Sequence, residues 1–192
     1  LVETSQGSFL GKMVFNCAGL SADKVQELAF QPSVRLNLDG AEYLVFDNQA
    51  PKPERIIFLQ ADRCGKGITA IPCVEGNLLL ESPSHPQDIP FATTRECMAF
   101  TREAARQLLP SLDTDAVIRS FGAVRPNPHK GDGSSIHDFC IEQPSPTFIS
   151  FIGIKTPGLT CSNELGVYAA ERIAEALSAV PNPDFNPHRA AI

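Results

Sequence analysis

The sequence lacks several features that would mark other classes of protein. It has no tryptophan and only two tyrosines in 192 residues. No run approaches about 18 consecutive apolar residues, so we expect no membrane-spanning helix. None of the six cysteines forms a C-x-x-C pair, so we expect no zinc or iron–sulfur site. There is no Walker A loop, and Gly65-Lys66-Gly67 stops short of G-x-G-x-x-G.

The charge balance is acidic, with 22 Asp and Glu against 16 Lys and Arg and a net charge of −6. This balance argues against nucleic-acid or anionic-membrane partners and leaves room for a local basic pocket that binds a small anion. The hydrophobic fraction of 43% and the charged fraction of 20% are those of a globular protein, which excludes disorder. The length predicts one domain, or one large one, at roughly 150 residues per domain.

The cysteines indicate the cellular compartment of the protein, and the first residue indicates whether the sequence is part of a longer protein. Six cysteines could form three disulfides, but Cys17 and Cys73 lie in apolar, strand-like runs typical of buried free thiols. We therefore expect reduced thiols and a cytoplasmic protein. The chain begins at Leu1 without a signal-peptide pattern, so we interpret it as part of a longer protein or as a processed product.

Hydrophobic periodicity predicts two α/β ends around a run of strands. The first end is a strand over 12–17 and a helix over 22–29, capped by Ser21, with Val25, Leu28 and Ala29 on its inner face. The last end is a strand over 147–154 and a helix over 163–177. For that helix we expect an inner face of Val167, Ala170, Ile173, Ala174 and Leu177.

The middle of the chain reads as short strands interrupted by one helix. A capping box of Thr93 and Glu96 predicts a helix over 94–109 that Pro110 ends. Gly76-Asn77 indicates a hairpin turn, and the Gly- and Pro-rich residues 127–137 indicate an exposed loop. The strands are expected at 34–38, 42–47, 55–60, 67–73, 77–81, 115–124 and 138–142.

This layout predicts an α+β fold in which a mainly antiparallel sheet is inserted into an α/β layer. Residues 1–32 and 147–178 would form the layer, and 33–146 the inserted sheet with its helix. Residues 179–192, which are rich in proline, are expected to be a loose tail.

Three segments could carry chemistry, although each also has a plain structural explanation. VFNCAGLSAD at 14–23 is a strand, a small-residue turn and a helix start, where backbone N–H groups can face an anion. FIGIKTPGLT at 151–160 is a glycine loop before the last helix. SFGAVRP at 120–126 delivers an arginine suited to a carboxylate or phosphate. A simple junction, a connecting loop and an ion pair remain the alternatives.

Together and in this order, these segments resemble FAD oxidoreductases of the glycine-oxidase and D-amino-acid-oxidase type. The resemblance is to the branch with FAD-dependent glycerol-3-phosphate dehydrogenases and L-2-hydroxyglutarate oxidases. Further matching segments are LDGAEYLVFD at 38–47, GKGITAIPCVEGNLLLESP at 65–83 and ATTRE at 92–96. The resemblance covers about residues 10–178. Because relatives bind FAD through an N-terminal G-x-G-x-x-G unit, it implies that this unit lies upstream of this chain.

The resemblance implies a set of site residues. Residues lying along FAD would be Ala18, Gly19, Gly122, Gly153, Gly158, Leu159 and Thr160. Arg125 would hold the anionic group of the substrate, with Lys155 and Tyr43 beside it. The last helix would direct its N-terminus at the flavin and stabilise negative charge on it.

The resemblance also leaves parts of the function open. The basic pair of the family motif R-K-G-E-Y is lost in LDGAEY, FAG has become FGA, and Glu81-Ser82 replaces the family glycine before Pro83. We therefore expect hydride transfer to flavin from a small anionic hydroxy substrate, either glycerol 3-phosphate or L-2-hydroxyglutarate. The alternative is a non-catalytic module that binds a small anion or a partner.

No histidine is assigned as the general base, which is expected upstream of this chain. Each of the four histidines is expected at the surface and off the family motifs: His85, His129, His137 and His188. We also expect the isolated chain to be inactive and to form homo-oligomers through an exposed sheet edge or apolar face.

Overall fold

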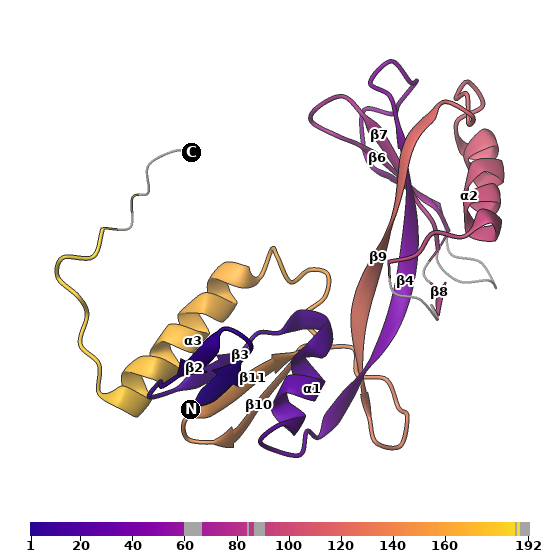
Figure 1. Ribbon diagram of the computed structural model, residues 1–192. Helices are drawn as coiled ribbons and strands as arrows, with labels where there is room; N and C mark the ends of the chain where they lie inside the picture. The colour runs from indigo at the N-terminus through magenta and orange to yellow at the C-terminus, as the bar shows by residue number, and fades with distance from the viewer. Residues whose placement is uncertain (60–66, 84, 87–90, 187, 189–192) are drawn as a thin grey trace. The chain divides into compact units, whose positions relative to one another are not determined.

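The computed structural model describes residues 1–59, 67–83, 85–86, 91–186 and 188. The chain forms two compact units (Figure 1). Unit 1 contains Leu1–Arg35 and Lys130–Ile192, and unit 2 contains Leu36–His129. Helices accompany mixed and antiparallel sheets, which confirms the predicted α+β class.

Unit 1 is built on a sheet whose strands come from the two ends of the chain. Its order is β10 (Cys140–Ser145), β11 (Phe148–Ile152) and β3 (Val14–Asn16). β11 pairs with β3 in parallel and with β10 antiparallel. The helices are α1 (Ala22–Glu27), which follows the 3-10 turn Gly19–Ser21, and α3 (Ser162–Leu177). The hairpin of β1 (Val2–Thr4) and β2 (Gly7–Phe9) was not predicted.

Alternation along β11 gives this unit three layers, because successive side chains of a strand point to opposite faces. On one face, the ring of Phe148 lies 5.2 Å from the ring of Phe30, just after α1, and Ser150 points the same way. On the other face, the ring of Phe151 meets Tyr168 of α3 edge-on, with 6.2 Å between centroids. The sheet therefore lies between α1 and α3 (Figure 1).

A buried asparagine fixes the turn from β3 into α1. The Asn16 amide nitrogen donates to the carbonyl of Ala22 at 2.7 Å and to the Ser150 hydroxyl at 2.9 Å, and its oxygen accepts from Ala18 N–H. The predicted cap at Ser21 is wrong, because the Ser21 side chain makes no capping hydrogen bond. Asn16 orders the turn in its place by bonding to both elements.

Unit 2 contains one antiparallel sheet, ordered β5 (Ile57–Phe58), β6 (Thr69–Pro72), β7 (Leu78–Glu81), β4 (Val34–Phe46) and β8 (His85–Pro86). β9 (Val117–Lys130) also pairs with β4. The β6–β7 hairpin turns at Gly76, with φ +93°, as predicted. The end of the predicted strand 55–60, Cys64, Gly65 and Lys66 lie outside the described residues.

Both long strands differ from the sequence predictions. β4 runs unbroken through Gly40, where two strands were expected, because β8 pairs with it at Asp39 and Gly40. β9 continues to Lys130, so the predicted loop 127–137 is wrong at its start. Asn127 donates to the Asp39 carboxylate at 2.7 Å, a side-chain bond that holds this proline-containing stretch against β4.

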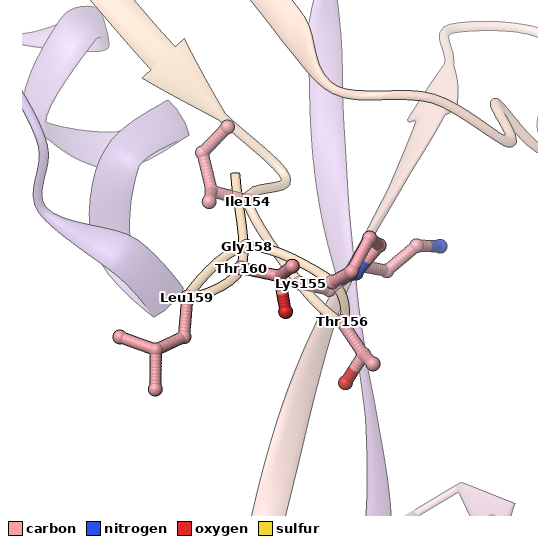
Figure 2. A pocket seen from close by; sticks show the side chains of 7 residues that line it. Ile154, Lys155, Thr156, Gly158, Leu159 and Thr160 are labelled. Atoms are coloured by element: carbon pink, nitrogen blue, oxygen red, sulfur yellow. The ribbon is translucent and has the colours of Figure 1, made fainter. Parts of the chain in front are cut away.

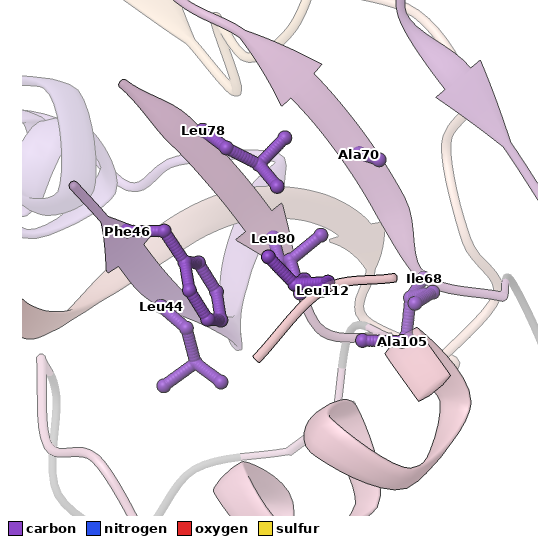
Figure 3. Close-up of a cluster of buried hydrophobic side chains, with 8 residues drawn as sticks. All are labelled: Leu44, Phe46, Ile68, Ala70, Leu78, Leu80, Ala105 and Leu112. Atoms are coloured by element: carbon purple, nitrogen blue, oxygen red, sulfur yellow. The ribbon is translucent and has the colours of Figure 1, made fainter. Parts of the chain in front are cut away.

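The hydrophobic core of unit 2 lies between its sheet and α2 (Arg95–Leu108). The helix begins at Thr94, whose side chain accepts from Cys97 N–H at 3.1 Å, so the predicted cap at Thr93 is off by one residue. Figure 3 shows the cluster of buried side chains: Leu44, Phe46, Ile68, Ala70, Leu78, Leu80, Ala105 and Leu112.

The first helix packs on other residues than periodicity predicted. α1 ends at Glu27, and Leu28 is 87% exposed, so the predicted inner face with Leu28 and Ala29 is wrong. Its buried residues include Gln26, which donates to the Glu142 carboxylate at 2.5 Å. A polar contact to β10, and not an apolar stripe, therefore fixes this short helix.

The last helix buries a side that only partly agrees with the predicted one. Of the predicted inner residues, Ile173 is partly buried, whereas Val167, Ala170, Ala174 and Leu177 are exposed. Leu165 and Ala169 are partly buried in their place. The predicted and the observed residues have similar helical spacing, so hydrophobicity alone does not decide between the two sides. None of the described helices is both long and apolar enough to cross a membrane.

Candidate functional site

A cavity of about 410 Å³ in unit 1 joins two of the three segments singled out in the sequence. Cys17 and Gly19 come from the β3–α1 junction, and Ile154 and Gly158 come from the loop after β11. Segments more than a hundred residues apart thus meet because β3 and β11 are neighbours in one parallel pair. The remaining lining residues are Phe151, Ser162, Leu165, Gly166 and Ala169.

Free space surrounds the backbone of the glycine at the β3–α1 junction. Gly19 has a φ of +56°, which disfavours any side chain, and a Cβ built on it would meet no atom within 4 Å. Ala18 is also exposed, although its N–H is already bonded to Asn16. A ligand can therefore approach the backbone at Gly19 closely. Cys17, predicted to be buried, is exposed here.

The loop after β11 is folded tightly on itself. Gly153 is buried with a φ of +71°, and Gly158 N–H donates to the carbonyl of Lys155. A Cβ at Gly158 would lie 2.7 Å from the Ile154 side chain and 2.8 Å from that carbonyl oxygen, so only glycine fits. The loop outlines a smaller cavity of about 240 Å³, lined by residues 154–160 (Figure 2).

The remaining predicted residues of this loop line the smaller cavity. Leu159 is 91% exposed, Thr160 is exposed and Lys155 is partly buried. The side chains of Leu159 and Lys155 leave the loop in opposite directions (Figure 2). Burial raises the pKa of the nearby Cys140 thiol, Glu142 and Asp138 raise it further, and the charge of Lys155 opposes them.

The start of α3 faces the larger cavity. No side chain caps this helix at Cys161, and its first turn lies where the positive end of the helix dipole acts. Ser162, Leu165, Gly166 and Ala169 are spaced i, i+3, i+4 and i+7, so they share one side of the helix. Sequence reasoning missed this side, although the small residues at this spacing were a usable signal.

A second polar group lies in unit 2 and contains two of the predicted substrate residues. An oxygen of Glu81 is 3.7 Å from an Arg125 guanidinium nitrogen, and the Tyr43 ring stacks on Phe121 at 4.8 Å between centroids. Burial, followed by the charge of Glu81 and a hydrogen bond to it, raises the pKa of Tyr43 to about 12. Tyr43 and Glu81 are direct partners across β4 and β7.

Glu81 was not singled out from the sequence as a site residue. Its side chain is only 8% exposed, against 33% for Arg125. The available signal was the Glu-Ser pair that stands where the resembled family has glycine. Gly122, predicted to contact a cofactor, packs against the backbone of Phe91 and Ala92, where a Cβ would come within 2.7 Å.

The comparison with protein families turns these features into a family assignment. The model of the family described as DAO, FAD dependent oxidoreductase, matches residues 1–172. The chain belongs to this family. Among curated DAO-family relatives, a glycerol 3-phosphate dehydrogenase of Caloramator mitchellensis is 27% identical over 98% of this chain and 39% of its own length. A glycerol 3-phosphate oxidase of Mycoplasma genitalium is 28% identical over 93% of this chain and 47% of its own length.

Solved DAO-family structures show the same fold. The L-alpha-glycerophosphate oxidase of Mycoplasma pneumoniae, with FAD bound, has a TM-score of 0.77 at 22% identity, over 95% of this chain and 47% of its own. Glycine oxidase from Geobacillus kaustophilus has a TM-score of 0.65 at 17% identity, over 98% of this chain and 48% of its own. The chain thus spans less than half the length of these relatives.

Proposed function

We propose that this chain is the C-terminal portion of a longer FAD-dependent oxidoreductase that oxidises a small anionic hydroxy substrate. The observation that carries the proposal is the cavity of about 410 Å³ in which Gly19 and Gly158 meet beside the start of α3. Membership of the DAO family supports the cofactor. The names of the curated relatives support glycerol 3-phosphate as a substrate, and L-2-hydroxyglutarate remains the second candidate.

The residues lining the cavity fit part of an FAD molecule. Its walls combine apolar side chains with glycines, and the open backbone at Gly19 leaves space where a side chain would otherwise stand. In this proposal, Ala18, Gly19, Gly153 and the Gly158–Thr160 segment contact the cofactor. The uncapped first turn of α3 offers partial positive charge to an anionic part of it.

FAD and the protein would have different roles in the proposed reaction. Bound FAD would supply the hydride-accepting ring, while the protein binds and orients the substrate. Arg125 is the residue proposed to hold the substrate anion, because a guanidinium binds carboxylate or phosphate through two parallel hydrogen bonds. Tyr43, which lies in the same unit, is proposed as its neighbour in the substrate site, and Lys155 of unit 1 is proposed as a further positive charge for the substrate. The cytoplasmic setting stays a prediction from the cysteine pattern.

The full-length protein provides the test. Purified without added cofactor, it should show visible flavin absorption that bleaches under anaerobic titration with glycerol 3-phosphate or with L-2-hydroxyglutarate. A protein that shows no flavin even after FAD is added would contradict the enzyme proposal. That outcome would leave the alternative, a non-catalytic small-anion or partner-binding module.

A pair of variants on α3 ties the flavin to this cavity. Gly166 lines the cavity, and a Cβ there would meet no protein atom within 4 Å, so the side chain of Gly166→Leu has an open start toward the cavity. We expect the full-length variant to lose bound flavin. Ala170→Leu is the control, since Ala170 is exposed on the same helix and is not among the lining residues. Equal flavin content in both variants would place the cofactor elsewhere.

A further inference from the structure

We propose that Glu81 is a specificity-determining residue that offsets the charge of Arg125. It thereby favours substrates that bring a singly charged carboxylate to Arg125 over substrates that bring a doubly charged phosphate. The proposal rests on the proposed function, because it concerns the substrate of the same oxidoreductase.

The geometry places Glu81 where it can act on Arg125. The carboxylate lies 3.7 Å from the guanidinium and is 8% exposed, so water screens the pair only weakly on the Glu81 side. Arg125 retains 33% exposure, which leaves part of its guanidinium accessible to a further anion. An anion that binds Arg125 must therefore approach a buried negative charge as well.

The sheet fixes Glu81 in this position. Glu81 pairs directly with Tyr43 on β4 and with Thr69 on β6, so the three side chains form one row on the same face of the sheet. The core residues Leu44 and Leu80 alternate with this row and face α2. The row is thus on the opposite face, and Arg125 reaches it from β9.

Glu81 contacts two polar groups of the row and of β9. Its carboxylate lies 3.7 Å from the Arg125 guanidinium, and a hydrogen bond links it to the Tyr43 side chain. Burial, and after it the charge of the Glu81 carboxylate, raises the pKa of Tyr43 to about 12. The pair of Glu81 and Arg125 is then close to neutral, whereas a phosphate dianion is best matched by an arginine whose charge is not offset.

The experiment compares the full-length flavoprotein with its Glu81→Gln variant. Flavin reduction is followed anaerobically with L-2-hydroxyglutarate and with glycerol 3-phosphate, at a pH above the second phosphate pKa of about 6. We expect the unchanged protein to prefer the carboxylate substrate, and Glu81→Gln to raise the relative efficiency with glycerol 3-phosphate about tenfold or more. Glu75→Gln is the charge-matched control on the exposed turn between β6 and β7, and should leave the ratio unchanged.

Each result decides between the alternatives. A preference of the unchanged protein for glycerol 3-phosphate, or an unchanged ratio in Glu81→Gln, would overturn the role of Glu81 while leaving the oxidoreductase proposal intact. If Glu81→Gln does not fold, the preference of the unchanged protein decides alone.

A binding measurement covers the case in which neither substrate reduces the flavin, which would contradict the proposed function. Thermal unfolding midpoints are then measured with acetate and with inorganic phosphate at matched ionic strength. A gain for phosphate over acetate in Glu81→Gln, absent in Glu75→Gln, supports the role of Glu81. Equal midpoint shifts in the unchanged protein and in Glu81→Gln contradict it.

Discussion

The buried carboxylate of Glu42 accepts two hydrogen bonds from Thr94, one from its backbone N–H at 2.7 Å and one from its hydroxyl at 2.9 Å. The same hydroxyl oxygen accepts from Cys97 N–H in the first turn of α2. Glu42 belongs to β4, so this one contact fastens the start of the helix to the sheet that it covers. Helix capping and tertiary packing in unit 2 therefore depend on the same two side chains.

Removing the Thr94 hydroxyl should destabilise the protein more than removing the Thr93 hydroxyl. We expect Thr94→Ala to lower the free energy of unfolding by about 1–2 kcal/mol, because the cap is lost and Glu42 loses a donor. Thr93→Ala, the matched control suggested by the sequence pattern, should change it by less than about 0.5 kcal/mol. Urea unfolding of both variants measures the difference, and equal losses would contradict the assigned cap.

Tyr43 should titrate far above an ordinary tyrosine. Its pKa is about 12, raised first by burial and then by Glu81. The chain has two tyrosines, so Tyr168→Phe leaves Tyr43 as the single phenol whose ultraviolet difference absorbance reports ionisation. Adding Glu81→Gln should lower this pKa toward, but not to, the unperturbed value of about 10, since burial remains. A midpoint near that value in the first variant would contradict the buried arrangement.

The same shift sets the direction of a pH effect on stability. The folded protein binds the phenolic proton more tightly than the unfolded chain. The stabilisation is therefore fully present below the unfolded pKa of about 10 and is lost as pH rises toward about 12. Denaturation of Tyr43→Phe beside the unchanged protein should show a shallower decline over that window. A parallel decline would show that other groups cause it.

Gly158 should tolerate no side chain. A methyl group there would press on Ile154 and on the carbonyl of Lys155, so we expect Gly158→Ala to cost about 1–3 kcal/mol of unfolding free energy. Gly131→Ala is the control, because a Cβ at Gly131 meets nothing within 4 Å. In the full-length protein, Gly158→Ala should also reduce flavin content. Unchanged stability in both variants would mean that the loop can open.

The isolated chain should associate with itself. Large apolar side chains are exposed at the loop after β11 and on α3, including Leu159 and Val167. Exposed apolar surface of this kind favours contact between copies. Light scattering at tens of micromolar should give a mass above that of one chain, increasing with concentration. A constant monomer mass over this range would contradict the prediction.

The sequence predicted the elements better than their ends and faces. The turn at Gly76 was recognised because glycine there has a specific conformational reason. The N-cap of α2 was predicted one residue early, at Thr93 instead of Thr94. Either threonine suits an N-cap by its local sequence, and only the hydrogen bond of Thr94 to Glu42 distinguishes them. The inner face of α3 was right only at Ile173, because tertiary contacts, such as that of Phe151 with Tyr168, decide between two apolar sides.

The same limit applies to the candidate site. Gly19 and Gly158 could be selected from local motifs, and the structure brings them to one cavity. Glu81 could not be connected with Arg125 from the sequence, because the contact joins β7 to β9 across more than forty residues. Long-range strand register, which local patterns do not encode, determines which charges meet.

The pairing of β3 with β11 also orders events while the protein is being made. Unit 2 is one uninterrupted stretch of chain, so its own contacts are available as soon as the ribosome has released it. The pairing of β3 with β11 can form only after β11 emerges, more than a hundred residues later. The hydrogen bond from the Asn16 amide to the Ser150 hydroxyl forms no earlier, and the proposed cofactor cavity also needs residues from both segments.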